Sequence, residues 1–280
     1  ESVRSRQVMD NPPGPMVRGV LNLSRMVEES DGLKIVAWNK LVETVVDAVR
    51  LLDAMVGMTE DARQDGYIGT VRRIGLGMIG FGELCIRLGY PYASPEAEAL
   101  ADQLAQFTRS ALREATAALS EYRPVVTGAY VDVRGMAEPV RNLSRLYVLP
   151  EPELAMMAET SPGIEPLSGL AGRYLQRDLL LRGLQISELL MDHLRRDNLV
   201  TERLMYELLD TGQLGPDADL PESVLELFAT AGDLEAGATE RIAYAFQSNC
   251  DDVVAVRHHL PATTKESELR RRISVALYQK

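Results

Sequence analysis

The sequence predicts an α/β fold in which helices dominate, and three patterns carry this prediction. Residues 34–58 place apolar side chains at helical spacing over a long stretch. Short β-like pieces broken by glycine and proline lie between Val125 and Pro166. From Leu170 onward the pattern is helical again. We therefore expect long helices packed on a few short, buried strands.

Two helices have the clearest signals. Between Lys34 and Met58 the residues that recur at helical spacing are Ile35, Trp38, Leu41, Val42, Val45, Val49, Leu52 and Val56. A second helix begins at Ser94-Pro95-Glu96, which supplies an N-cap, a proline in the first turn and an acidic side chain near the positive end of the helix dipole. That helix must end before Pro124.

The remaining boundaries follow from breakers and turn residues. Residues 1–18 are predicted as an extended lead-in, because prolines in Asn11-Pro12-Pro13-Gly14-Pro15 forbid a helix. Residues 211–221 are predicted as a loop rich in glycine, proline and aspartate. Further strand-like pieces (125–126 and 146–149) and helices (about 222–231, 239–251 and 265–278) complete a single domain over 1–280, without an internal repeat.

Composition and charge exclude several classes of protein. The chain has 280 residues and a formal net charge of −11, which argues against a nucleic-acid partner because phosphate recognition demands clustered Lys and Arg. No apolar run reaches membrane-spanning length. Two cysteines fit a reducing cytoplasm, where we expect the protein to be located. The first residue is Glu1 rather than methionine, as is typical of a fragment or a processed product.

The segment Gly75-Leu76-Gly77-Met78-Ile79-Gly80 has the spacing of a dinucleotide-binding turn. Its context argues against that function. Two arginines, Arg72 and Arg73, stand where a fully buried parallel strand should be apolar. No second strand ending in an acid follows at the required distance. We therefore predict close backbone packing at a strand-to-helix turn.

Residues 73–81, continuing through Leu88-Gly89-Tyr90-Pro91-Tyr92 to Ser94, resemble a signature of ribonucleotide reductase large chains, of the adenosylcobalamin-dependent type. Further matches follow in the family's order: Asn22–Val27, Ala48–Asp53, Arg141-Asn142, Ser161–Pro166, Phe228–Ala231, and Ala245-Phe246-Gln247 with Asp251. The resemblance implies the second half of a ten-stranded α/β barrel.

The resemblance also implies where chemistry would occur. In that family a finger loop carries a cysteine that becomes a thiyl radical and, two residues later, a glutamate base. Here the loop corresponds to Asn11-Pro12-Pro13-Gly14-Pro15, so Pro13 and Pro15 occupy the reactive positions. The position of one of the family's reducing cysteines falls on Met16, so this thiol is missing as well. We therefore predict no catalytic residues in this chain.

A third departure falls on the loop that holds the substrate phosphate in that family. It corresponds to residues 149–155, where Glu151, Pro152 and Glu153 stand in place of backbone and hydroxyl donors. Carboxylates at this position repel a phosphate rather than bind it. A later family segment, S-K-T-x-N, falls on residues 255–259.

The two cysteines have plain structural interpretations. Cys85 lies among apolar residues of a helix and is predicted to be a buried thiol. Cys250, with Asp251, Asp252 and the pair His258-His259, offers the alternative of a metal cluster. Adjacent histidines on a strand point to opposite faces and cannot chelate one ion. We predict no metal.

Three functions remain open at this point. The first is a non-catalytic reductase-like protein, with no cofactor, retained as a scaffold, a regulatory subunit or a partner. The second is one subunit of a split, active ribonucleotide reductase that uses adenosylcobalamin and obtains its missing half from another chain. The third is an unrelated small-molecule enzyme built on the same scaffold with new acids, such as Glu151 and Glu153. Half a barrel leaves open sheet edges, which predicts a homo-oligomer or a complex with another reductase-like chain.

Overall fold

The computed structural model describes residues 16–62, 72–123, 130–133, 136–174, 183–215, 218–235, 237–252, 254–257 and 264–278. The first half of the chain holds β1 (Val17–Asn22), the 3-10 helix η1 (Leu23–Arg25), β2 (Val27–Ser30), β3 (Leu33–Val36), α2 (Trp38–Ala62), β4 (Arg73–Ile79), α3 (Phe81–Leu88) and α4 (Pro95–Ser120). The second half holds β5 (Tyr130–Val133), β6 (Met136–Pro139), β7 (Leu143–Leu146), α5 (Pro152–Met157), β8 (Ala171–Tyr174), β9 (Gly183–Ile186), α6 (Glu188–Arg196), α7 (Glu202–Thr211), α8 (Glu222–Leu227), α9 (Ala238–Gln247) and α10 (Glu266–Tyr278).

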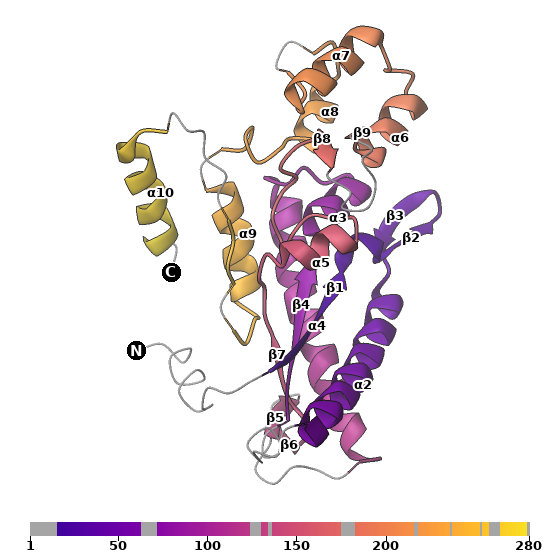
Figure 1. The fold of residues 1–280 in the computed structure, drawn as a ribbon, viewed down its shortest axis with the longest axis vertical. Coiled ribbons are helices and arrows are strands. Elements are labelled where there is room, and N and C mark those ends of the chain that lie inside the picture. Colours follow the sequence, from indigo (N-terminus) through magenta and orange to yellow (C-terminus); the bar gives the residue numbers. More distant parts are fainter. Residues whose placement is uncertain are drawn as a thin grey trace.

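The centre of the molecule is a three-stranded parallel sheet in the order β1-β4-β7 (Figure 1). Parallel neighbours need long crossover connections, and α2 joins β1 to β4 while α3 and α4 lie between β4 and β7. A parallel bridge between Val148 and Val254 continues the sheet beyond β7. The pairs β2–β3, β5–β6 and β8–β9 are antiparallel hairpins.

The main hydrophobic core lies between this sheet and the two long helices. Side chains alternate along a strand, and Ile74, Leu76 and Met78 of β4 point into the core. The buried side of α2 is made by Leu41, Val45, Val49, Leu52 and Val56, as the sequence pattern predicts. A second, smaller cluster holds α6, α7 and α8 together and consists of Leu170, Leu190, Leu194, Leu204, Leu208, Val224 and Phe228.

Several boundaries differ from the sequence predictions. The predicted helix starts at Trp38 rather than Lys34, because Leu33–Val36 pairs with Val27–Ser30 in a hairpin. Asp31 and Gly32 both have positive φ, of 53° and 77°, as a two-residue hairpin turn requires.

The structure also corrects the lead-in and the region after Leu170. Strand β1 already begins at Val17, and the strand predicted at 146–149 lies at Leu143–Leu146. The predicted helical pattern after Leu170 begins instead with the hairpin of β8 and β9. The predicted loop 211–221 starts one residue later, because Thr211 still belongs to α7. The predicted strand-like piece at 125–126 lies outside the described residues.

The predicted cap of the second helix is present, and it gives a simple test of local stability. Ser94 has extended backbone angles and its Oγ accepts a hydrogen bond of 3.2 Å from the backbone N–H of Ala97. Ser94→Ala should lower the free energy of unfolding by about 1 kcal/mol in urea denaturation. Ser94→Asp keeps a capping oxygen and should retain most of the stability. Equal losses in the two variants would contradict this role for the hydroxyl.

Candidate functional site

One face of β4 is made of glycine, and two large side chains lie directly on it. A Cβ on Gly75 would lie 2.7 Å from Cε of Met16, and one on Gly77 would lie 2.7 Å from Cζ of Tyr147. Both distances are far below van der Waals contact. Only glycine fits at Gly77 beside the Tyr147 ring, whereas a Cβ at Gly75 would require the end of the Met16 side chain to move. We call this the inner face, because it lies opposite the side chains that pack on α2 and α4. Tyr147 is 2% exposed there, so the inner face is filled by the chain's own side chains.

The hydroxyl of Tyr147 is held by polar neighbours. Its Oη lies 3.3 Å from the carbonyl oxygen of Gly19 and 3.4 Å from Oε1 of Glu151. Arg18 pairs with the same carboxylate oxygen at 3.5 Å, and its guanidinium lies 5.8 Å from the centre of the Tyr147 ring. Burial raises the pKa of Tyr147, and the nearby Glu151 charge raises it further, with Arg18 opposing. Tyr147 is therefore a neutral hydrogen-bond donor at physiological pH.

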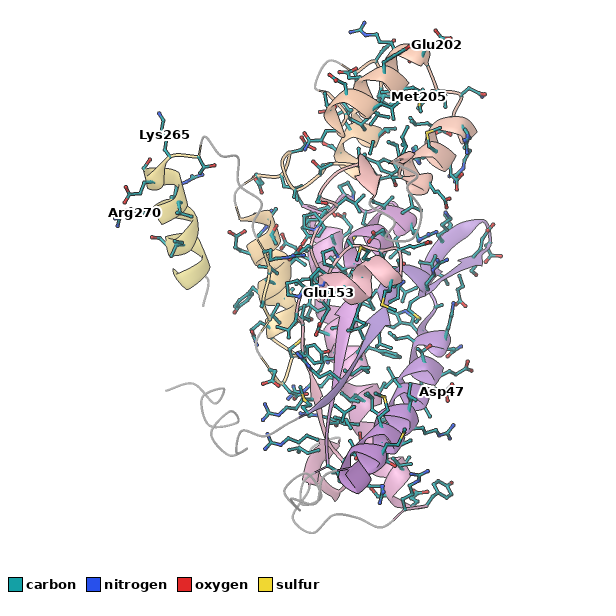
Figure 2. The ribbon with its side chains drawn as sticks, in the orientation of Figure 1. Asp47, Glu153, Glu202, Met205, Lys265 and Arg270 are labelled. Atoms are coloured by element: carbon teal, nitrogen blue, oxygen red, sulfur yellow. The ribbon has the colours of Figure 1, made fainter. Side chains whose placement is uncertain are left out.

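The segment predicted to replace a phosphate-binding loop lies near the carboxyl ends of β1 and β4, where α5 begins (Figure 1). Glu151 has a positive φ of 42° and precedes α5, while Pro152 and Glu153 form its first turn. The carboxylates of Glu151 and Glu153 do not share a partner. Glu151 turns to Arg18 and Tyr147, whereas Glu153 is exposed (Figure 2).

The strand-to-helix turn after β4 is packed too closely to hold a dinucleotide. Gly80 has φ of 78°, and a Cβ there would lie 2.8 Å from Oδ1 of Asn22. The backbone N–H of Gly80 donates to the carbonyl oxygen of Ser161 at 2.9 Å. Glu83, in the first turn of α3, accepts hydrogen bonds from the backbone N–H and the hydroxyl of Ser161. The prediction of close backbone packing at these glycines is confirmed.

A buried carboxylate ties the amino ends of β4 and β7 to α2. Oδ1 of Asp53 accepts hydrogen bonds from Arg72 at 2.8 Å, Arg141 at 2.8 Å and Asn142 at 2.9 Å, and Oδ2 accepts one from Arg123 at 2.6 Å. The Asp53 side chain is 0% exposed. Burial by itself raises the pKa of this carboxyl, but the hydrogen bonds from Asn142, Arg72 and Arg141 outweigh it and hold the pKa below its usual value.

Asp251 plays a similar structural part beside β7. It accepts hydrogen bonds of 3.0 Å from Arg109 and Arg113 of α4 and from the backbone N–H of Leu146. The neighbouring Asp252 pairs with Arg145 at 2.7 Å. These contacts occupy the carboxylates that the metal alternative would need. Within the described part of the chain, no group of three potential ligands is close enough to hold a metal ion. His258 and His259 lie outside it.

Residues 19–128 match the model of a protein family described as the ribonucleotide reductase barrel domain. This segment therefore belongs to a ribonucleotide reductase barrel domain. The vitamin B12-dependent ribonucleoside-diphosphate reductase of Mycobacterium tuberculosis (strain CDC 1551 / Oshkosh) is 31% identical over 262 residues, covering 90% of this chain and 36% of that protein. The enzyme of the same name from Thermoplasma acidophilum is 28% identical over 264 residues, covering 92% and 33%.

The similarity extends to a solved reductase structure. The class Id ribonucleotide reductase alpha subunit of Actinobacillus ureae superposes with a TM-score of 0.65 and 15% identity, over 89% of this chain and 49% of that chain. At this identity the likeness shows the fold alone. The chain spans about a third of the length of the curated reductases it matches. Its fold, a parallel sheet with many helices around it, is therefore part of a reductase-type barrel.

Both cysteines of this reductase-like chain are packing residues. Cys85, on α3, is fully buried, and burial together with the nearby Glu83 charge raises the pKa of its thiol. Cys250 follows α9, and burial with the nearby Asp251 charge raises its pKa to about 12. A thiolate is disfavoured at both positions. The prediction that Cys85 is a buried structural thiol is confirmed.

The structure describes only part of the predicted degenerate site. Asn11, Pro13 and Pro15 lie outside the described residues. Met16 is described and lies on the inner face against Gly75, with its Sδ 2.8 Å from where a Cβ would be.

Sequence reasoning missed two features of the site. One is Tyr147 on the inner face; a strand whose glycines alternate with apolar residues signals a neighbouring large side chain, and β4 has that pattern. The other is Asp53, whose partners include Arg72 and Arg141. The sequence did contain a signal for this cluster. An aspartate at the buried edge of an amphipathic helix indicates that charged or hydrogen-bonding partners lie nearby.

Among the described helices, none combines the length and apolar character that a membrane crossing requires.

Proposed function

We propose that this chain is a non-catalytic ribonucleotide reductase-like protein that acts as a scaffold, a regulatory subunit or a partner of another chain. The observation that carries the proposal is the filled inner face. Tyr147 lies on Gly77, and Met16, at the position that the resemblance gives to a reducing cysteine, lies on Gly75. The turn at Gly80, by contrast, has the close packing that a structural role requires.

Charge at the carboxyl end of the sheet supports the same proposal. Glu151 and Glu153 stand at the position of the phosphate loop, and carboxylates there oppose the approach of a phosphate. Arg18 offsets the charge of Glu151 through their 3.5 Å contact. Because Arg18 is paired with Glu151, it is less able to bind a phosphate.

The described residues do not fit adenosylcobalamin as a source of radical chemistry. Such chemistry needs a thiol that can carry the radical to the substrate. Cys85 is buried in the hydrophobic core, and Cys250 is partly buried and packed against the same core. We therefore propose no cofactor for the isolated chain and derive no step through one.

The alternative is a subunit of a split, active ribonucleotide reductase. The observation that favours it is the open sheet: among the described strands, β1 pairs only with β4 and leaves its other edge unpaired. An unpaired parallel edge invites another strand. A second reductase-like chain would then supply the remaining strands, the thiols and the adenosylcobalamin site.

Both versions predict that the protein associates, either with itself or with another reductase-like chain in the cytoplasm. Light scattering after size-exclusion chromatography tests the first case, and co-expression with a longer reductase chain followed by affinity purification tests the second. A monodisperse monomer that captures no reductase chain would contradict the prediction.

Calorimetric titration with ribonucleoside diphosphates separates the two functions. The non-catalytic protein should show no saturable binding of ADP, CDP, GDP or UDP, because the inner face is filled. Tyr147→Ala provides a matched variant in which that space is opened. Micromolar affinity in the unmodified protein would support the split enzyme instead.

A further inference from the structure

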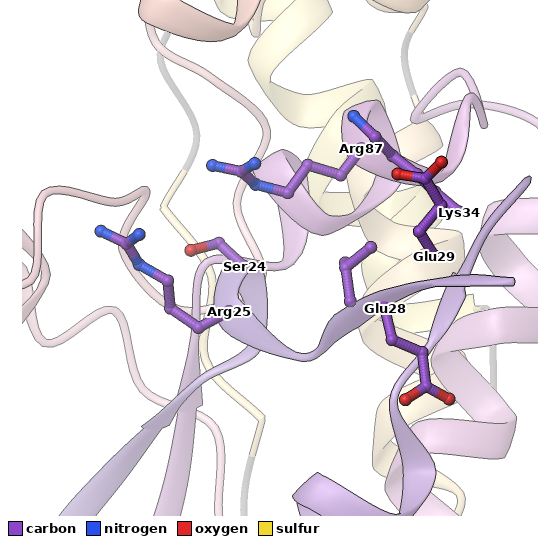
Figure 3. A pocket seen from close by; sticks show the side chains of 7 residues that line it. Ser24, Arg25, Glu28, Glu29, Lys34 and Arg87 are labelled. Atoms are coloured by element: carbon purple, nitrogen blue, oxygen red, sulfur yellow. The ribbon is translucent and has the colours of Figure 1, made fainter. Parts of the chain in front are cut away.

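A hollow of about 290 Å³ lies beside the carboxyl end of β1 (Figure 3). It is bounded by η1, the β2–β3 hairpin and the last turn of α3. Its lining residues are Ser24, Arg25, Val27, Glu28, Glu29, Lys34 and Arg87. The volume lies just below the range for drug-sized ligands, about 300–1,000 Å³, and so suits a small ligand.

Three cations line this hollow, beside the two carboxylates of Glu28 and Glu29. Arg25, Lys34 and Arg87 make no ion pair within the described part of the chain, although the whole protein carries a net charge of −11. Most other described arginines nearby, such as Arg18, have a carboxylate partner. Three cations and two carboxylates give the lining a net charge of +1. Unpaired cations gathered in one concavity form a site suited to an anion.

Arg87 supplies the strongest sign of a missing partner. Its Nε is buried and has no hydrogen-bond acceptor among the described residues. The end of α3 does not need this side chain, because the backbone N–H groups of Gly89 and Tyr90 already cap the carbonyl oxygens of Ile86 and Cys85. A buried donor without an acceptor is uncommon in a folded protein. An acceptor placed in the hollow would satisfy it.

The charges in the hollow are separated into two ends. Figure 3 shows Arg25 and Arg87 extending toward the side where Ser24 lies, while Glu28 points away from them. Glu29 lies opposite Lys34 in the hairpin register. Ser24 is held in place, since its Oγ donates to Oδ1 of Asn22 at 2.6 Å. The basic end of the hollow is thus formed by the guanidinium groups of Arg25 and Arg87 beside the fixed side chain of Ser24.

We propose that this hollow binds the phosphate group of a small phosphate monoester or free phosphate, held between Arg25 and Arg87. Guanidinium groups form paired hydrogen bonds with phosphate oxygens. The carboxylates of Glu28 and Glu29 at the other end oppose a polyanion, so the ligand carries a single phosphate group. This site is independent of reductase chemistry and of the inner face.

The test is calorimetric titration of the whole chain at low ionic strength with inorganic phosphate and, separately, with glycerol 3-phosphate. Saturable binding of either supports the site. Tighter binding of the monoester would identify an esterified ligand, and equal affinities would assign recognition to the phosphate group alone. Arg25→Gln and Arg87→Gln should each weaken binding by about tenfold, the loss expected for one charge-assisted contact.

Two further variants guard against an indirect effect. Arg195→Gln removes an exposed arginine of α6 that pairs with Asp192, and it should leave affinity unchanged. Glu28→Gln removes a like charge from the hollow and should tighten binding several-fold, a gain that unfolding cannot produce. Absence of saturable binding by both ligands, or the same affinity in all four variants, would overturn the proposal.

Discussion

Asp53→Asn is expected to lower the free energy of unfolding by about 3–5 kcal/mol, the usual cost of removing one partner from a buried ion pair. The carboxylate accepts hydrogen bonds from three arginines and Asn142 while its side chain is 0% exposed. An amide at this position carries no charge and turns an N–H toward a guanidinium donor. The arginines would then be left near one another without their shared counter-ion.

Asp47→Asn is the matched control, on the same helix. Its side chain is 77% exposed and lies 3.5 Å from Arg50 (Figure 2). An exposed pair of this kind contributes between about 0 and 1 kcal/mol. Urea denaturation of the three proteins gives the comparison. Equal and small losses for the two variants would show that the Asp53 cluster does not stabilise the fold.

The pH dependence of the Asp53 variant has a defined sign. Because the pKa of Asp53 is lowered in the folded protein, its contribution is complete above the unfolded pKa of about 3.9. That contribution is lost as the pH falls through the lower, folded pKa. The difference in stability between the wild type and Asp53→Asn should be constant near neutral pH and shrink below about pH 4. A difference that grows on acidification would contradict the assignment.

Gly77→Ala should lower the free energy of unfolding by about 1–3 kcal/mol, because the new methyl group overpacks the inner face. The nearest atoms to a Cβ at this position all belong to Tyr147, at 2.7 to 2.9 Å. The ring is buried between β4 and its neighbours and cannot move aside without disturbing its contacts with Gly19 and Glu151. Thermal and urea denaturation both measure the loss.

A double-mutant cycle assigns that loss to its cause. Tyr147→Ala alone should cost about 3–5 kcal/mol by leaving a cavity. Adding Gly77→Ala in that background should cost nearly nothing, since the clashing ring is gone, so the two effects should not add. Gly57→Ala is the control: nothing lies within 4 Å of a Cβ there, and alanine in α2 should stabilise by about 0.5–1 kcal/mol. Additive losses at Gly77 and Tyr147 would argue that the ring does not fill the inner face.

Local signals in the sequence predicted the long elements well. Ser94 acts as the N-cap it was predicted to be, and the buried positions of α2 follow the helical spacing from Leu41 to Val56. Such features depend on residues a few positions apart. The hairpin of β2 and β3 was equally local, with Asp31-Gly32 at its turn, but the helical periodicity around Ile35 obscured it.

Long-range contacts could not be read in the same way. The contact of Tyr147 with Gly77 and the convergence of Arg123 and Arg141 on Asp53 join residues about 70 to 90 positions apart. Periodicity carries no information about which distant side chains meet. The barrel-type fold was predicted from the resemblance to the reductases, and the comparison with known proteins confirms this prediction. It gave no indication that a tyrosine fills the inner face.

The claim that this scaffold lacks catalytic activity is tested most directly by an assay for deoxyribonucleotide formation. The purified chain would be incubated with adenosylcobalamin, a dithiol reductant and ribonucleoside diphosphates, beside the Thermoplasma acidophilum reductase as an active control. The filled inner face and the position of Cys85 in the hydrophobic core, with Cys250 packed against the same core, predict no product above the blank. Turnover to deoxyribonucleotides by the chain alone would contradict the account.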